Sequence, residues 1–360
     1  MTTRRAVLAM GAGLCTGAFA PAELRIASAK RDLWRNAGGA KLRGAVFVQR
    51  RVYPELDGPE FLGPGPFGQP VTDAALESLA GANANLASWS GPGLFSETEP
   101  FALDPAVEDH VADWLDRCRA HGLYTTLCLR SGPGRSAFAF HPGETWYPAQ
   151  LYDDSLWRDA EKQAAWAEMV AETLRRFGGH PAFAGIKVID EPNGADIGAD
   201  GVWPGFARRI KAACVGLDHD TPLIFSPDRW GRAERAAELR AAIGPEPVLA
   251  VHDYSPWAYT HQGPGERVRF VPARDIAQIQ AEGDVAVMEF GVVRRAPDIE
   301  DYLSARIAAF ERAGANWAVF RWSSGWAPYE AKEGAMAIDE NIPAQLLLRR
   351  AFARNTVRPG

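Results

Sequence analysis

Two short stretches, Val188-Ile189-Asp190-Glu191-Pro192-Asn193 and Val287-Met288-Glu289-Phe290-Gly291, indicate how the chain folds. In each, a glutamate ends a run of β-branched and other apolar residues, which is the pattern of a buried parallel strand. Burying a carboxylate costs free energy, so it is expected where such a strand ends at a polar cleft. The two glutamates are 98 positions apart (289 − 191), so they come from different strands and can meet only through the fold.

The same pattern recurs along the chain. After residue 40, short apolar stretches alternate with amphipathic ones, which predicts eight strand–helix units and a single (β/α)8 barrel over residues 30–360. The expected strands are Leu42–Val48, Asn85–Trp89, Tyr124–Leu129, Gly185–Ile189, Pro222–Phe225, Val248–Val251, Val285–Met288 and Trp317–Phe320. The expected helices are Asp73–Leu79, Ala106–His121, Trp157–Phe177, Gly205–Val215, Ala233–Ala242, Ala273–Ala281, Ile299–Ala313 and Ala344–Ala353.

Local signals mark several helix boundaries. Thr72 and Asp104 are expected N-caps, and Gly122 and Gly314 stand where helices should stop. The competing architecture, a doubly wound sheet, usually carries a glycine-rich phosphate turn after an early strand. No such turn is visible, because Gly132-Pro133-Gly134 has a proline where a helix N-terminus needs free N–H groups.

The composition excludes several classes of protein. The 360 residues are 47% hydrophobic and 23% charged, which is ordinary for a globular protein with a sizeable core. The net charge is −6 without a basic stripe, so nucleic acid is not an expected partner. No apolar run after residue 20 reaches the ~18 residues of a membrane-spanning helix. Cys118, Cys128 and Cys214 match no zinc spacing and are expected to be buried thiols.

The first 29 residues have the pattern of a twin-arginine signal peptide. Arg4-Arg5 precedes the small, apolar stretch Ala6–Ala20, and possible cleavage sites end at Ala20 and Ala29. Pro21 disfavours the first site, so cleavage after Ala29 is expected, with an uncleaved anchor as the alternative. The mature protein is then expected in the periplasm or outside the cell.

Polar or aromatic residues follow nearly every expected strand, at the barrel end where active sites lie. These residues give the chain a resemblance to glycoside hydrolase family 5 and its clan of retaining (β/α)8 glycosidases. The resemblance covers roughly residues 42–326, and four motifs in register carry it: Asp190-Glu191-Pro192, His252-Asp253-Tyr254, Glu289-Phe290-Gly291 and Trp322.

The resemblance implies a role for each motif. Glu191 would be the acid/base and Glu289 the nucleophile of a double displacement on a polysaccharide or glycoconjugate, without a cofactor or metal. Tyr254 or an arginine such as Arg43 would keep Glu289 ionised. His252 would donate a hydrogen bond near the acid.

Tryptophans are the expected sugar platforms, because the C–H groups on one face of a sugar stack on aromatic rings. Trp322 would form the floor of the site. Four further tryptophans at or after strand ends are candidates for sugar subsites: Trp89, Trp230, Trp257 and Trp326.

The chain departs from the family pattern at three places. Asp190 replaces the asparagine that meets the sugar 2-hydroxyl, the strand-two arginine is missing from Asn85–Trp89, and Arg130 replaces a histidine near strand three. Asp190 would accept a hydrogen bond from the sugar 2-substituent, and Arg130 would supply the missing positive charge. Arg135 and Arg229 are interpreted as ordinary loop charges.

Two other functional classes remain as alternatives. A catalytically silent carbohydrate-binding barrel is supported by Asp190 alone, and both glutamates argue against it. A metal-dependent barrel hydrolase would need His and Asp clusters at strand ends, whereas the seven histidines are dispersed. The sugar, the linkage and the oligomeric state stay open.

Overall fold

The computed structural model describes residues 30–57, 67–217, 220–272, 283–325, 330, 332–340 and 342–360. The predicted signal peptide (residues 1–29), the expected helix Ala273–Ala281 and Trp326 lie outside these residues.

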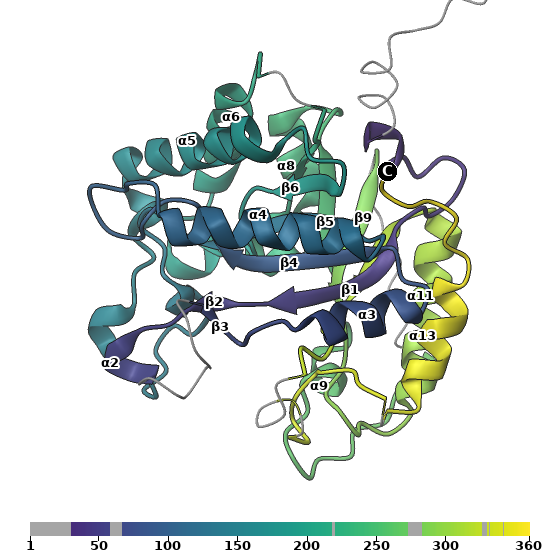
Figure 1. Ribbon diagram of the computed structural model, residues 1–360. Helices are drawn as coiled ribbons and strands as arrows, with labels where there is room; N and C mark the ends of the chain where they lie inside the picture. Colours follow the sequence, from purple (N-terminus) through teal and green to yellow (C-terminus); the bar gives the residue numbers. More distant parts are fainter. Residues whose placement is uncertain are drawn as a thin grey trace, which may run out of the picture.

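Eight parallel strands of the described residues close into a barrel, and their order around the ring follows the chain (Figure 1). They are β1 (Arg43–Val48), β4 (Leu86–Pro92), β5 (Tyr124–Ser131), β6 (Phe183–Lys187), β7 (Leu223–Phe225), β8 (Val248–His252), β9 (Val285–Phe290) and β10 (Asn316–Val319). A small antiparallel ribbon of β2 (Arg50–Arg51) and β3 (Phe67–Gly68) follows β1. The predicted (β/α)8 barrel is confirmed, and each expected strand has a counterpart.

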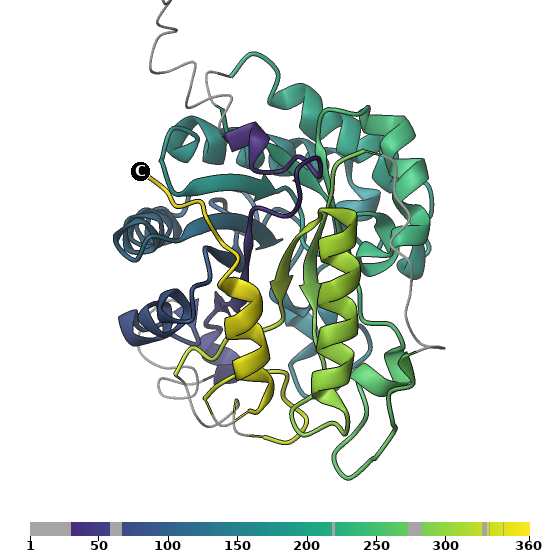
Figure 2. The same ribbon diagram turned by 90° about the vertical axis from the view of Figure 1, so that its right-hand side faces the viewer.

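Helices surround the barrel, and α11 and α13 lie side by side on its outer face (Figures 1 and 2). The longer helices are α3 (Asp73–Gly81), α4 (Pro105–Ala120), α5 (Ala160–Phe177), α6 (Val202–Ala213), α8 (Ala236–Ile243), α11 (Ile299–Ala313) and α13 (Ala344–Phe352). The short α-helices are α2 (Pro54–Asp57), α7 (Asp228–Gly231) and α9 (Trp257–Thr260). The 3-10 turns are η1 (Ala137–Phe140), η2 (Ala149–Leu151), η3 (Ser155–Arg158), η4 (Gly194–Ile197) and η5 (Ala233–Arg235). None of the helices in these ranges is long and apolar enough to cross a membrane.

The predicted helix boundaries are confirmed where the caps can be inspected. The Thr72 hydroxyl accepts a hydrogen bond from the Ala75 N–H, and the Asp104 carboxylate caps α4 ahead of Pro105. Such caps satisfy N–H groups that have no partner within the helix, and each contributes about 1 kcal/mol. Gly314 ends α11 with φ 68°, a left-handed conformation that glycine adopts without strain.

Alternate strand residues pack into two hydrophobic layers. One layer draws on most of the strands, with Val46, Ile224 and Met288 among its members, so it fills the inside of the barrel. Trp34 belongs to it and donates from Nε1 to the Ala184 carbonyl, 2.8 Å away, near the start of β6. The other layer lies between strands and helices. All three cysteines of the described residues are buried and unpaired, as expected.

Candidate active site

The two glutamates meet at the C-terminal end of the barrel. Glu289 is the next-to-last residue of β9, where strict alternation would turn it away from Met288, which faces inward. A register shift prevents this: Val251 pairs with Val287 but His252 pairs with Glu289, so β9 carries one extra residue. Such a bulge redirects the side chains that follow it. It lets Met288 and Glu289 both lie on the inner side.

Glu191 stands beyond the end of β6, on a sharply bent segment. Its φ is 43°, in the left-handed region that costs a residue with a Cβ roughly 1–3 kcal/mol. The buried Arg135 guanidinium holds this bend by donating to the Asp190 carbonyl and, at 3.0 Å, to the Glu191 carbonyl. The interpretation of Arg135 as a loop charge is therefore wrong. Its side chain is fully buried and it positions the backbone of the acidic motif.

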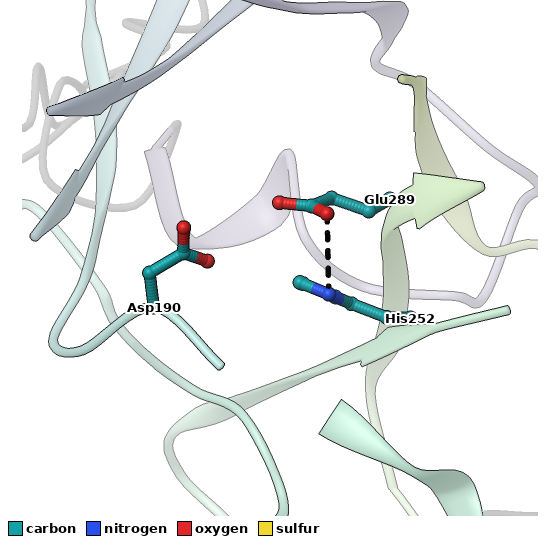
Figure 3. A group of neighbouring side chains, drawn as sticks. All are labelled: Asp190, His252 and Glu289. Atoms are coloured by element: carbon teal, nitrogen blue, oxygen red, sulfur yellow. Dashed lines mark ion pairs between the residues drawn. The ribbon is translucent and has the colours of Figure 1, made fainter. Parts of the chain in front are cut away.

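His252 lies between the two carboxyl groups. Its Nδ1 is 2.9 Å from Glu191 Oε1 and 3.3 Å from Glu289 Oε2 (Figure 3 draws the second contact). The sum of these distances, 6.2 Å, is the upper limit for the separation of those two oxygens. The side chain of Glu191 is 19% exposed and that of Glu289 is 6% exposed, so the pair borders solvent mainly through Glu191.

Lys187, the last residue of β6, was not among the predicted site residues. Its Nζ lies 2.7 Å from Asp190 Oδ1, 2.6 Å from His252 Nε2 and 4.0 Å from Glu289 Oε1. An ammonium group can only donate, so His252 Nε2 must accept and the ring proton must reside on Nδ1. His252 is thus a neutral imidazole whose Nδ1–H points at the carboxyl pair. Burial lowers the pKa of His252 to about 4, which agrees with this neutral form.

The charges in this cluster give the three acids different ionisation states. Although burial alone would raise it, the Lys187 ammonium and Arg130 hold the pKa of Asp190 well below its usual range. Burial, and next the Asp190 charge, raise the pKa of Glu191 to about 7. Burial also raises the pKa of Glu289 to about 7, and the Asp190 and Glu191 charges act in the same direction. Asp190 is therefore ionised, whereas the two glutamates retain a shared proton close to neutral pH.

Asp190 is fully buried, and its oxygens have partners within the protein. Oδ1 accepts from Lys187, and Oδ2 accepts from the Ser90 hydroxyl at 2.7 Å and from Arg130 at 3.2 Å. No surface of Asp190 is left for a sugar to contact, which corrects its predicted role in substrate binding. The Arg130 guanidinium lies beside Asp190 and carries a positive charge there.

Asp190, His252 and Glu289 each have a ligand atom within 4.8 Å of the others, a grouping that could suit a metal ion (Figure 3). Lys187 bears on this possibility, because its ammonium already contacts two of the three. A second cation there would be repelled by the first. The group of side chains therefore fits an internal ammonium better than a divalent metal.

Three solved structures share this architecture. Pseudomonas stutzeri endoglucanase Cel5A superposes with a TM-score of 0.62 at 16% identity, over 91% of this chain and 98% of that one. Thermotoga maritima Cel5A, in a mutant form with cellobiose, has a TM-score of 0.60 and 12% identity, and the match covers 90% of this chain and 98% of that one. A further glycoside hydrolase has a TM-score of 0.63 and 18% identity, and the match covers 88% of this chain and 100% of that one.

The fold is that of the Cel5A endoglucanases. The resemblance expected from four motifs is confirmed at the level of the fold. No protein-family model matches the sequence, and a search of the curated proteins finds no match.

Two other predicted contacts agree with the geometry of this Cel5A-like barrel. The Tyr254 hydroxyl donates to Glu289 Oε2 at 3.0 Å. Burial and the neighbouring Glu289 raise the pKa of Tyr254 well above its usual range, so it remains a donor. Trp257 lies in α9 just after β8, is 64% exposed and stacks on His261 with ring centroids 3.4 Å apart.

Arg43 and Trp89 lie away from the carboxyl pair, contrary to prediction. Arg43 is the first residue of β1, at the opposite end of the barrel, and forms a two-point ion pair with Glu311 at 2.6 and 2.7 Å. Trp89 is fully buried in the layer between strands and helices, and its Nε1 donates to Gln49. Ser90, one position on, faces inward, so the alternation of the strand turns Trp89 outward.

Trp322 is also wrong as the floor of the site. It is 2% exposed and packs in the outer layer near Phe352, at 6.4 Å between ring centroids. Phe320 takes the inner position instead, two residues after the inward-facing Ala318. Its ring meets that of Tyr254 edge-on at 6.3 Å. Trp230, the remaining candidate of the described residues, lies 6.3 Å from the Phe140 ring.

Proposed function

We propose that the chain is a retaining glycoside hydrolase that cleaves O-glycosidic bonds in a polysaccharide or glycoconjugate by double displacement. The observation that carries the proposal is the bridging of two carboxyl groups by one imidazole nitrogen. Their facing oxygens are at most 6.2 Å apart. Retaining enzymes hold their carboxyls about 5–5.5 Å apart, and inverting enzymes about 6.5–9.5 Å. Facing oxygens this close to one another are compatible with the retaining spacing.

The donors around each carboxyl assign the two roles. Glu289 faces the Tyr254 hydroxyl, the His252 Nδ1–H and, at 4.0 Å, the Lys187 ammonium. All three favour its ionised form, which a nucleophile requires. Glu191 faces His252 alone among these groups, so fewer donors oppose its protonation, as a general acid requires. Burial raises the pKa of both glutamates to about 7, so the donors decide between them. The shared proton therefore belongs on Glu191.

The reaction then follows in two steps. A Glu289 oxygen attacks the anomeric carbon while the bond to the leaving oxygen breaks, and Glu191 gives that oxygen its proton. In the second step Glu191 takes a proton from water, the water oxygen attacks the anomeric carbon, and Glu289 departs as a carboxylate. Two inversions give a product with the original anomeric configuration.

The solved neighbours support a β-linked polysaccharide as the substrate. Structures of this fold include the Pseudomonas stutzeri endoglucanase with cellobiose and Thermotoga maritima Cel5A with mannotriose. The test is incubation with a panel of β-glucans, β-mannans, anionic β-glycans and aryl β-glycosides, with reducing ends and the product anomer as readouts. We expect hydrolysis of at least one member with a retained anomer by NMR. Hydrolysis that gives the inverted anomer contradicts the mechanism, and inactivity on every member contradicts the proposal.

Replacing Asp190 with asparagine should move the alkaline limb of the pH profile to lower pH. The limb of kcat/KM reports loss of the proton from the general acid of the free enzyme, here Glu191 near pH 7. The Asp190 charge helps to raise that pKa, so its removal lets Glu191 lose its proton earlier. The profile of Asp190→Asn is compared with the parent on one substrate. An unchanged limb would show that Asp190 does not tune the acid.

A further inference from the structure

A cavity of about 220 Å³ lies where β1, β5 and β10 end. Its wall includes Phe138, Trp146 and Phe320, and Trp146 is 48% exposed. An exposed aromatic face such as that of Trp146 suits the C–H face of a sugar. The β2–β3 ribbon and the end of β5 contribute polar residues to the same lining. The cavity thus combines an aromatic wall with a polar one, as a sugar subsite requires.

The arginines that line the cavity give it a positive charge. Arg50, Arg130 and Arg321 line the cavity, and no aspartate or glutamate is among the described residues that do. Their side chains are only 12–18% exposed, so their charges are poorly screened by water. Burial lowers the pKa of Arg321. The charge of Arg130 lowers it further, because the two guanidinium groups repel each other.

The acidic partners of these arginines lie behind the cavity wall. Asp57 binds Arg50, and Asp190 binds Arg130. Arg321 is the least compensated of the three, since its Nη2 is 3.7 Å from Glu330 Oε1 and its Nη1 donates to the neutral Gln69 side chain at 2.5 Å. An anion in the cavity would meet Arg321 and Arg130 together, and would relieve their mutual repulsion.

Two residues of the cavity wall contact residues of the reaction site. Arg130 reaches Asp190, the neighbour of Glu191 in the chain. Phe320 contacts Tyr254, which in turn donates to Glu289. A sugar in the cavity would therefore be joined to the sugar whose bond is cleaved.

We propose that this cavity binds an acidic sugar unit, one that carries a carboxylate or a sulfate ester, next to the sugar at the cleavage point. The inference rests on the proposed hydrolase function and names its substrate class. Guanidinium groups bind both kinds of anion through paired, charge-assisted hydrogen bonds. The substrate is thus an anionic glycan, and the experiment separates its two possible anionic groups.

The test compares oligosaccharides that share one backbone. The probes are a β-1,4-oligoglucuronate, a 6-sulfated cello-oligosaccharide and the neutral cello-oligosaccharide of equal length, with Kd measured by calorimetry and hydrolysis followed in parallel. We expect at least one anionic probe to bind at least about tenfold more tightly than the neutral one, as a charge-assisted hydrogen bond allows. The tighter of the two anionic probes identifies the group that the cavity prefers.

Arg321→Gln should bring the ratio of neutral to anionic Kd close to one. Arg267→Gln is the matched control, because Arg267 is a 60% exposed surface residue and its loss should leave the ratio unchanged. The inference is overturned if neither anionic probe binds more tightly than the neutral one, or if Arg321→Gln keeps the preference. Cleavage of the neutral probe without any anionic preference leaves the hydrolase proposal standing and removes this one. Tight binding of an anionic probe without cleavage of any probe supports the anion-binding cavity and contradicts the hydrolase proposal.

Discussion

Replacing Glu289 with alanine is expected to lower kcat by roughly 10⁴-fold or more, because the proposed double displacement would lose its nucleophile. The side chain is 6% exposed and its neighbours hold it ionised, so no nearby group can take its place in the attack. The measurement is the initial rate on the best substrate of the panel. Glu246→Ala is the matched control, since Glu246 is an exposed surface acid that pairs with Lys211, and it should keep the parent rate.

Azide distinguishes a lost nucleophile from a damaged site. The small anion can enter the space that the carboxylate leaves and attack an activated aryl glycoside directly. A single displacement inverts the anomeric centre, so the product is expected to be a glycosyl azide of inverted configuration. A retained glycosyl azide would assign Glu289 to the acid/base role instead. Full activity without azide would remove Glu289 from the mechanism.

Replacing Lys187 with methionine is expected to lower the free energy of unfolding by about 3–5 kcal/mol at pH 7. The change removes the cation from a buried ion pair and leaves the Asp190 carboxylate behind with fewer partners. Activity should fall as well, because His252 loses the donor that fixes its proton on Nδ1. Chemical denaturation measures the first effect, and kcat the second.

The pH dependence of this stability loss has a definite sign. The pKa of Asp190 is depressed in the folded chain, so its pairing stabilises above its unfolded pKa of about 4 and is lost as the pH falls. Asp190 raises the pKa of Lys187 despite burial, so the lysine contributes up to its unfolded pKa of about 10 and beyond. The difference between parent and Lys187→Met should therefore be largest between about pH 5 and 10 and shrink below about pH 4.

Two further variants test whether the ion pair is the cause. Lys187→Met combined with Asp190→Asn should recover part of the lost stability, because no unpaired charge is then buried. Lys211→Met is the surface control. Lys211 pairs with Glu246 at 2.8 Å with 34% of its side chain exposed, and its loss should cost less than about 1 kcal/mol. Equal losses for the two lysines would refute the role given to Lys187.

The sequence was sufficient to predict the barrel and the meeting of Glu191 with Glu289. Eight strand–helix units close into a barrel, and the C-terminal ends of all its parallel strands lie at one end. Acids that follow two such strands therefore come close together. Lys187 could have been found as well, because it was the charged residue inside an expected apolar strand. It lies within the strand, whereas most site residues were expected after a strand ends.

The errors have a common physical origin. Arg43 is the first residue of β1, and the first residue of a strand lies at the opposite end of the barrel from the last. Trp89 and Trp322 were judged by their closeness to strand ends, whereas the side on which a residue lies decides whether it meets the cleft. The bulge at Met288 could not be read from the sequence, since it depends on how β9 pairs with both neighbours.

The left-handed backbone of Glu191 sets function against stability at one position. A glutamate there carries both the strain of a φ of 43° and a carboxyl whose raised pKa weakens the fold as the pH rises from about 4.5 toward 7. Glycine would relieve both. Directed evolution for heat resistance alone would accordingly tend to collect catalytically dead variants at residue 191, and a selection for this protein has to demand turnover at the same time.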